Sequence, residues 1–218
     1  AEIGIQLAEA QLDAVRCVFE NSAMVITGGP GTGKTTIIRT IIELMQRSRR
    51  RVALTAPTGR AAKRMTELCQ MEAKTIHRLL EITPGSGEVG TAFARNAQNP
   101  LSCDVLIVDE MSMVDILLMD SLLAAVPRGT RLVMVGDSDQ LPSVGAGNVL
   151  KDIIDSDALT CIRLKEIFRQ ARESMIVVNA HRINNGEMPL LNDRDNDFFL
   201  VERSDPLTLP DTIADLCA

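Results

Sequence analysis

The glycine-rich run TGGPGTGKTT, at residues 27–36, is the first stretch of the sequence whose residue types and spacing are suited to chemistry. Gly28, four further residues, and then Gly33, Lys34 and Thr35 match the spacing of a phosphate-binding P-loop. Because glycine has no Cβ, successive backbone N–H groups in such a turn can surround an anion. Lys34 would then reach the β and γ phosphates of a nucleotide, and the Thr35 hydroxyl would hold Mg²⁺.

The segments on either side of this turn support the same interpretation. An apolar run at residues 24–26 predicts a strand before it, and apolar residues at helical spacing over residues 36–45 predict a helix after it. The positive end of that helix would add to the attraction for phosphate. A structural glycine turn that matches by coincidence is the alternative, and the strand-to-helix context argues against it. We therefore predict a nucleotide-binding site formed by Gly29, Gly31, Thr32, Gly33, Lys34, Thr35 and Thr36.

A second candidate for chemistry is an acidic pair, Asp109 and Glu110, directly after the apolar run at residues 105–108. This run is apolar at every position, as a central parallel strand should be. Beside a P-loop, such an aspartate can hold Mg²⁺ while the neighbouring glutamate orients and deprotonates the attacking water. Without a P-loop, the same pair would more often be a cap or a solvated turn.

Two further residues are candidates for contacting the γ phosphate. Gln140, in the sequence GDSDQLP at residues 136–142, follows another apolar run and could gain and lose one hydrogen bond as hydrolysis proceeds. Arg169, in FRQ, could stabilise the charge of the transferring phosphoryl group. A plain turn and a surface arginine are the respective alternatives, and the residues alone favour them.

Strand-like runs alternate with helical patterns along most of the chain, which predicts an α/β fold with a parallel sheet and helices on both faces. Ligands would bind at the carboxyl ends of the strands. Besides the elements above, we expect strands at residues 51–56, 132–135, 160–164 and 197–201. We expect helices at about 7–19, from the turn at 57–59 through 69, and at 76–80, 147–154 and 174–183. Residues 83–100 should form a loop or hairpin.

Composition excludes several classes of protein. Across 218 residues the apolar runs stay too short to span a bilayer, and the beginning of the sequence lacks a signal-peptide pattern. The five cysteines are scattered singly, which argues against both a disulfide framework and a cysteine zinc site. We therefore expect a reducing, cytoplasmic setting.

Charge is unevenly distributed along the chain. The formal net charge is −6, but residues 47–78 contain many arginines and lysines and few acidic residues. Such a window indicates either a nucleic-acid contact or a solvated basic face, and charge alone does not decide between them. With five Phe and neither Trp nor Tyr in the sequence, base stacking could contribute only a little to a grip on a single strand.

Six segments of the sequence resemble, in order and spacing, the RecD family of superfamily 1 helicases, which move 5′ to 3′ on single-stranded DNA. They are GGPGTGKTT, LTAPTGRAAKRMTE, KTIHRLL, VLIVDEMSMVD, VMVGDSDQLPSVGAGNVL and EIFRQARESMIVVNAHRINNGEMP. The resemblance covers residues from about 7 to 189. It implies a RecA-like P-loop NTPase domain at residues 1–188, the first of two motor domains of an ATP-dependent DNA helicase in recombinational repair.

The resemblance also implies roles for individual residues. Gln11 would read the adenine edge, although an exposed polar residue on an amphipathic helix is the alternative. Gln140 and Arg169 would contact the γ phosphate. His77 could instead be a core or capping residue, and His181 receives no role beyond a structural one. The DNA backbone would be contacted by Pro57, Thr58, Arg60, Lys63, Arg64, Thr75 and His77.

Superfamily 1 motors hydrolyse ATP between two RecA-like domains, and the motifs of the second domain are not found after residue 189. We therefore expect residues 189–218 to form a linker and the beginning of the second domain, and the isolated segment to be weakly active or inactive. Two alternatives stay open. One is a nucleotide-dependent remodelling or switch protein that is indifferent to DNA. The other is a RecD-type subunit that works with RecB-like and RecC-like partners in an exonuclease V complex, with DNA cleavage in another chain.

Overall fold

The computed structural model of the chain describes residues 7–82, 93–166, 173–191, 196–202, 205 and 208–217. The chain divides into two compact units, Ala1–Ile167 and Phe168–Ala218, which are described separately. The first unit contains the sheet and every candidate site residue except Arg169, which lies outside the described residues. The predicted domain boundary at residue 188 falls within the second unit and stays a prediction.

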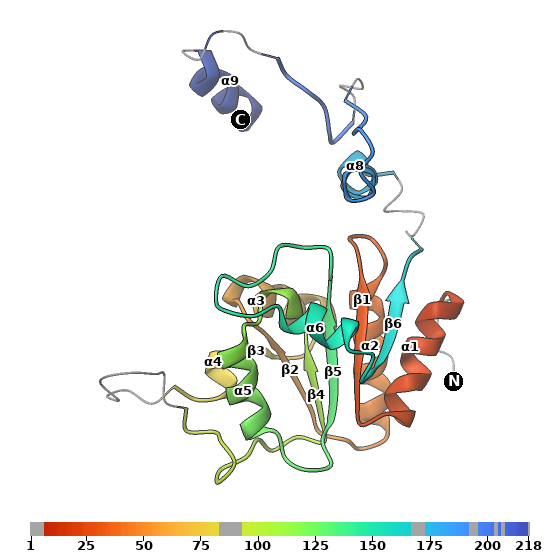
Figure 1. Cartoon of the computed structure of the whole chain (residues 1–218), viewed down its shortest axis with the longest axis vertical. Coiled ribbons are helices and arrows are strands. Elements are labelled where there is room, and N and C mark those ends of the chain that lie inside the picture. Colours follow the sequence, from red (N-terminus) through yellow and green to blue (C-terminus); the bar gives the residue numbers. More distant parts are fainter. Residues whose placement is uncertain are drawn as a thin grey trace. The chain divides into compact units, whose positions relative to one another are not determined.

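The first unit is built around a six-stranded sheet in the order β3-β2-β4-β5-β1-β6. Every strand pair is parallel, which confirms the predicted fold class (Figure 1). The strands are β1 (Ala23–Gly28), β2 (Val52–Ala56), β3 (Ala73–Thr75), β4 (Val105–Val108), β5 (Arg131–Gly136) and β6 (Thr160–Leu164).

Helices cover both faces of the sheet, because successive residues of a strand point to opposite sides. In β4, Val105 and Ile107 join a core with α1 (Glu9–Glu20), α2 (Lys34–Arg47) and α3 (Gly59–Cys69). Leu106 and Val108 join the other core, which contains residues of α4 (Ile76–Leu79), α5 (Ile116–Ala125) and α6 (Val149–Asp155). All four residues of β4 are 0% exposed, so the strand has to be apolar throughout.

The strand order brings together the ends of β1, β5 and β4. β5 lies between the other two, with Thr27 of β1 paired with Gly136 and Val108 of β4 paired with Met134. The carboxyl ends of parallel strands share one edge of the sheet. The segments that follow these three strands therefore begin side by side.

Most predicted elements are confirmed to within a few residues, and Thr75 is the N-cap of α4. The strand predicted at residues 197–201 is wrong, because this segment forms no strand. Three elements were not predicted: β3, the short helix η1 (Met111–Met113) and α5. β3 is only three residues long, and α5 (ILLMDSLLAA) is apolar around most of its circumference, so neither has a clear periodic signal.

The second unit contains α8 (Met175–Asn184) and α9 (Leu209–Cys217). Asp197 caps the first turn of α8, since its carboxylate accepts hydrogen bonds from the Ser174 hydroxyl at 2.5 Å and from Met175 N at 2.6 Å. Asn179, which is 0% exposed, bonds both backbone groups of Leu190. Across the parts of the chain that the structure describes, helices have neither the length nor the apolar character needed to cross a bilayer.

Candidate nucleotide-binding site and adjoining basic surface

The glycine-rich turn joins β1 to α2 and adopts a backbone that requires glycine at two positions. Gly31 has φ of 76° and Gly33 has φ of 79°, both in the left-handed region that disfavours other residues. The Thr32 hydroxyl donates to Gly29 O at 2.8 Å and closes the turn. Gly33 is the N-cap of α2, so the N–H groups of the first helical turn, which have no partner within the helix, lie at the glycine-rich turn.

Lys34 is the cation at the centre of this site. Its Nζ donates to Gly28 O and, at 3.1 Å, to Gly29 O. Burial lowers the pKa of Lys34, while the charges of Asp137, Asp109 and Glu110 act in the opposite direction. Lys34 therefore lies within electrostatic reach of all three carboxylates.

Asp109 and Glu110 occupy the carboxyl end of β4, beside that of β2. Asp109 is 8% exposed, and its N–H donates to Thr55 O at 2.9 Å. Burial, and next the charge of Glu110, raise the pKa of Asp109 to about 6, against the opposing effect of Lys34. Glu110 has φ of 55° and precedes the short helix η1 (Met111–Met113), so the chain turns sharply after the acidic pair.

Gln140 lies in a turn directly after β5. Its N–H donates to Asp137 O at 3.3 Å, and Asp139 N donates to Asp137 Oδ1 at 3.1 Å. The side chain of Gln140 is exposed, whereas Asp137 is only 3% exposed. The turn is also bonded to the strand that leads into the P-loop, through Ser138 N and the Thr27 hydroxyl at 3.2 Å.

Gln11 links α1 to the P-loop. Its Oε1 accepts the N–H of Ala8 at 3.1 Å, and its Nε2 donates to Thr32 O at 3.5 Å. Gln11 is 2% exposed, so the alternative of an exposed polar residue is wrong. Its predicted contact with adenine stays a prediction.

The predicted Mg²⁺ ligands, Thr35 and Asp109, supply hard oxygen donors of the kind that Mg²⁺ prefers. Within the described ranges there is no group of three or more His, Cys, Asp or Glu side chains suited to a metal. Mg²⁺ usually binds through one or two carboxylates together with water and substrate phosphates, so this sparse donor set fits a nucleotide-bound ion.

The predicted DNA-contacting residues lie where β2 and β3 end. Thr58 caps α3, accepting Ala61 N at 3.2 Å, and Thr75 caps α4, accepting Arg78 N at 3.2 Å. These strands are neighbours, with Ala56 paired with Thr75. A capping hydroxyl that accepts an N–H still has its own proton to donate to a phosphate.

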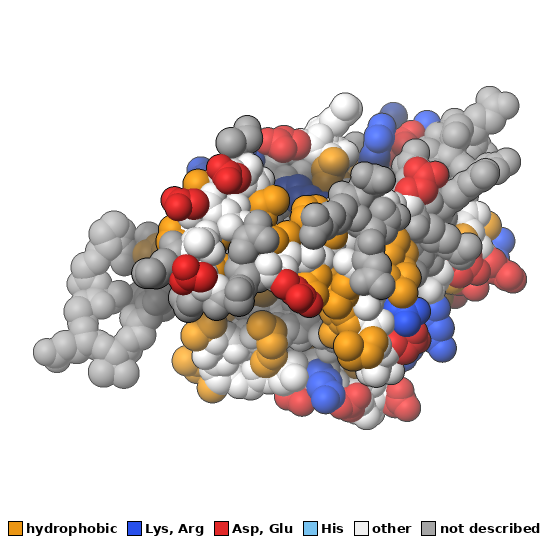
Figure 2. Space-filling view, turned by 90° about the horizontal axis from the view of Figure 1, so that it is seen from above, with side chains coloured by type: hydrophobic (Ala, Val, Ile, Leu, Met, Phe, Trp, Pro, Cys, Tyr) orange, Lys and Arg blue, Asp and Glu red, His pale blue; other side chains and the backbone are white. Residues whose placement is uncertain are grey.

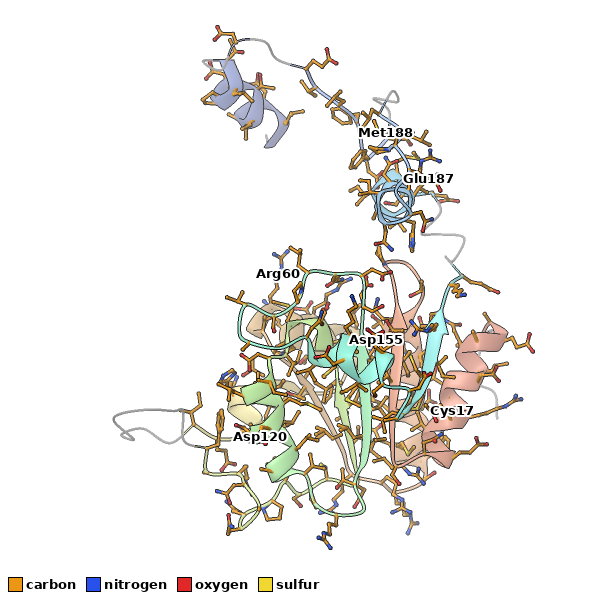
Figure 3. The ribbon with its side chains drawn as sticks, in the orientation of Figure 1. Cys17, Arg60, Asp120, Asp155, Glu187 and Met188 are labelled. Carbon is orange, nitrogen blue, oxygen red and sulfur yellow. The ribbon has the colours of Figure 1, made fainter. Side chains whose placement is uncertain are left out.

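Three exposed basic residues of α3, Arg60, Lys63 and Arg64, extend this surface, and Pro57 lies immediately before it. Figure 3 shows Arg60 at the end of the sheet to which the strands point. The charge of Arg64 acts on both Lys34 and Asp109, so this part of α3 is within electrostatic reach of the nucleotide site. The ring of His77 lies 5.9 Å from that of Phe93.

The basic window at residues 47–78 does not form one surface. Arg51 lies at the amino end of β2 and forms an ion pair with Asp104 at 2.9 Å, and Arg47 pairs with Glu43 at 2.7 Å. The five residues of β2 separate Arg51 from the α3 group by about 16 Å along the strand. On the face seen in Figure 2, charged side chains of both signs are interspersed with hydrophobic ones.

Two buried residues at this edge were missed by sequence reasoning. Asp137 follows β5 as Asp109 follows β4, and this shared position after an apolar run was the signal that could have identified it. Thr27, at 3% exposure, had no distinguishing signal, because its role depends on the neighbouring strand.

A parallel sheet with a P-loop after β1 and a lysine among carboxylates at the strand ends defines a P-loop nucleotide-binding domain. The chain belongs to the family described as AAA domain, whose family model matches residues 11–146.

Similar proteins include RecD-type helicases. The chain is 42% identical over 188 residues to the ATP-dependent RecD2 DNA helicase of Deinococcus radiodurans, covering 86% of this chain and 25% of that protein. It is 36% identical over 228 residues to the RecBCD enzyme subunit RecD of Mycobacterium tuberculosis, covering 91% of this chain and 39% of the relative. These matches confirm the predicted resemblance to the RecD family, while the chain spans well under half of either relative.

Solved structures with a similar fold include Pif1 helicases. The Pif1 helicase from Candida albicans is 27% identical, with a TM-score of 0.58 over 85% of this chain and 45% of that one. Bacteroides Pif1 bound to ssDNA is 22% identical and has a TM-score of 0.55 over 88% of this chain and 52% of that one. The second likeness concerns the fold alone.

Proposed function

We propose that this chain is the ATP-hydrolysing first motor domain of a 5′ to 3′ DNA helicase or translocase that acts in recombinational DNA repair. The observation that carries the proposal is the convergence of Lys34, from the P-loop, with Asp109 and Glu110, from β4, at one edge of the sheet. A cation beside backbone donors suits a triphosphate, and a carboxylate beside it suits a base for the attacking water.

In this proposal Lys34 exchanges its bonds to Gly28 O and Gly29 O for bonds to phosphate oxygens. Glu110 orients a water and takes its proton as the water attacks the γ phosphate. Gln140 and Arg169 contact the γ phosphate, and Gln11 contacts the adenine. Thr35 and Asp109 would hold Mg²⁺, which when bound neutralises phosphate charge.

The proposed substrate track is single-stranded DNA along Pro57, Thr58, Arg60, Lys63, Arg64, Thr75 and His77. Two observations support this track. The capped N-termini of α3 and α4 follow neighbouring strands, β2 and β3, and the basic side chains of α3 are exposed. A helix N-terminus and basic side chains both favour phosphate. ATP-driven closure and reopening against a second motor domain would then move phosphate contacts along one strand.

Partners and location are part of the same proposal. The similarity to a RecBCD subunit supports RecB-like and RecC-like partners, and the similarity to RecD2 supports action as an ATP-dependent DNA helicase. The cysteines that the structure describes, Cys17, Cys69, Cys103 and Cys161, are free thiols, which suits the proposed reducing cytoplasm.

The test is DNA-stimulated ATP hydrolysis and unwinding by the full-length natural protein, with 5′-tailed and 3′-tailed duplexes. Lys34→Ala should reduce turnover to background, whereas Lys151→Ala, which removes an exposed lysine of α6, should retain the wild-type rate. Unwinding should require a 5′ tail. ATP hydrolysis that is indifferent to single-stranded DNA would instead support the remodelling or switch alternative.

A further inference from the structure

The loop that carries Gln140, residues 137–148 between β5 and α6, is attached to its neighbours at both ends. At its start, Ser138 N donates to the Thr27 hydroxyl at 3.2 Å, and this hydroxyl donates to Ser138 Oγ at 3.3 Å. Thr27 directly precedes Gly28, the first glycine of the P-loop pattern. The beginning of the loop is therefore fixed to the nucleotide-binding turn.

The far end of the β5–α6 loop is seated on the N-terminus of α5. Ile116 N donates to Ala146 O at 3.0 Å. Asp115 caps α5 through Leu118 N at 2.8 Å, and its other oxygen faces Gly145. A Cβ added to Gly145 would lie 2.1 Å from Asp115 Oδ2 and 2.8 Å from Asp115 Cβ, so only glycine fits against this carboxylate.

The seat on α5 is connected to the acidic pair by a short segment, residues 111–114, in which Met113 alone is exposed. Met113 N donates to Glu110 O at 3.0 Å, and Val114 N donates to Met111 O at 3.1 Å. Met111 and Val114 are 0% and 1% exposed. Closely packed segments of this kind transmit displacement because they do not deform continuously. The positions of Asp115 and Glu110 are therefore coupled.

Between its two attachments the β5–α6 loop is open to solvent. Leu141 is 87% exposed and Val144 is 109% exposed. Ser143 stiffens the far half, since its Oγ lies 3.0 Å from both Gly145 O and Gly147 O. The placement of Gln140 therefore depends on the two ends of the loop.

We propose that Asp115 is a positioning residue that, through its contact with Gly145, sets the place of Gln140 relative to Glu110. The inference rests on the proposed ATP hydrolysis and adds a residue that touches neither nucleotide nor DNA. Asp115 holds the β5–α6 loop and the segment after the acidic pair in fixed positions relative to each other. Glu110, the proposed base, and Gln140, the proposed γ-phosphate contact, are thereby placed around the same phosphate.

The test is Gly145→Ala in the full-length natural protein, since the added methyl group displaces the loop from Asp115. The kcat of DNA-stimulated ATP hydrolysis should fall by about 10-fold or more, because small misplacements of reacting groups are costly. The affinity for ADP should stay within about twofold, while the affinity for ADP with aluminium fluoride, which mimics the transition state, should fall with kcat. Val144→Ala, at the adjacent exposed position, is the matched control and should retain both.

A second variant separates positioning from helix capping. Asp115→Ser keeps a capping hydroxyl but removes the carboxylate that faces Gly145, so it should lower kcat with unchanged ADP affinity even though α5 stays capped. If Gly145→Ala does not fold, Ser143→Ala serves in its place and should lower kcat with unchanged ADP affinity.

Three outcomes would overturn the inference. They are wild-type turnover in Gly145→Ala or its substitute, equal losses of ADP and ADP with aluminium fluoride affinity, and wild-type turnover in Asp115→Ser. A full-length protein without DNA-stimulated turnover would overturn the proposed function and this inference together.

Discussion

Gly28 lies directly against Leu164 of β6, its partner in the strand register. A Cβ added to Gly28 would lie 2.8 Å from Leu164 O, 2.9 Å from Leu164 Cβ and 2.8 Å from the Thr32 hydroxyl. The first glycine of the P-loop is therefore required by the neighbouring strand as well as by any phosphate. This contact links the nucleotide-binding turn to the edge of the sheet.

Gly28→Ala should destabilise the folded protein by about 1–3 kcal/mol, since the added methyl group meets backbone and Cβ atoms that cannot turn away. Urea unfolding of the nucleotide-free protein measures the loss. Gly59→Ala is the control, because a Cβ there meets no atom within 4 Å. Equal free energies of unfolding for the two variants would show that β6 shifts at Leu164 to make room for the added methyl group.

Asp109→Asn should stabilise the nucleotide-free, metal-free protein at neutral pH. The folded-state pKa of Asp109, about 6, is above its ordinary value of 3.8, so the folded protein is penalised when the carboxylate is charged. The stability that this raised pKa supplies is fully present below pH 3.8 and is lost as the pH rises through about 6. Above that pH the difference corresponds to about 3 kcal/mol in favour of the variant.

Urea unfolding in EDTA at several pH values checks this prediction. Asp120→Asn, on the exposed side of α5 (Figure 3), is the control for replacing a carboxylate. The Asp109→Asn advantage should shrink as the pH falls from about 7 to 4. A constant advantage over this range would mean that charge burial at Asp109 is not its cause.

Arg60→Gln and Lys63→Gln should each reduce the salt dependence of single-stranded DNA binding by the full-length protein. Each lost phosphate contact lowers the slope of log K against log salt by about 0.7. Arg49→Gln and Arg50→Gln, exposed on the loop before the amino end of β2, are the controls. Slopes measured by fluorescence anisotropy that fall equally in all four variants would contradict a DNA track at the carboxyl ends of β2 and β3.

Asn179→Ala should weaken the second unit locally by about 1–3 kcal/mol, because it leaves two backbone groups of Leu190 without their side-chain partner. Asn179 Oδ1 accepts Leu190 N at 2.7 Å, and its Nδ2 donates to Leu190 O at 2.9 Å. Hydrogen exchange at the Leu190 amide reports the change directly. Asn185→Ala, at an exposed position after α8, should leave this exchange rate as it is.

Local residue order was enough to predict five of the six strands and to single out the P-loop and the acidic pair. A buried parallel strand must be apolar at every position, as in β4, and a phosphate-binding turn requires glycines at fixed spacing. Both signals lie within a few consecutive residues. The lysine and the glutamate of the proposed site could therefore be identified from the sequence, and the structure brings them to one edge of the sheet.

Other features were decided only by tertiary structure, because they depend on which distant segments become neighbours. The insertion of β5 between β1 and β4 brings Asp137 to Lys34, and no local pattern specifies that order. The basic window is continuous in sequence, but β2 runs through it and carries its two halves to opposite ends of the sheet. The close approach of Gly145 to Asp115 likewise exists only once β4 and β5 are paired, since pairing aligns the segments that follow them.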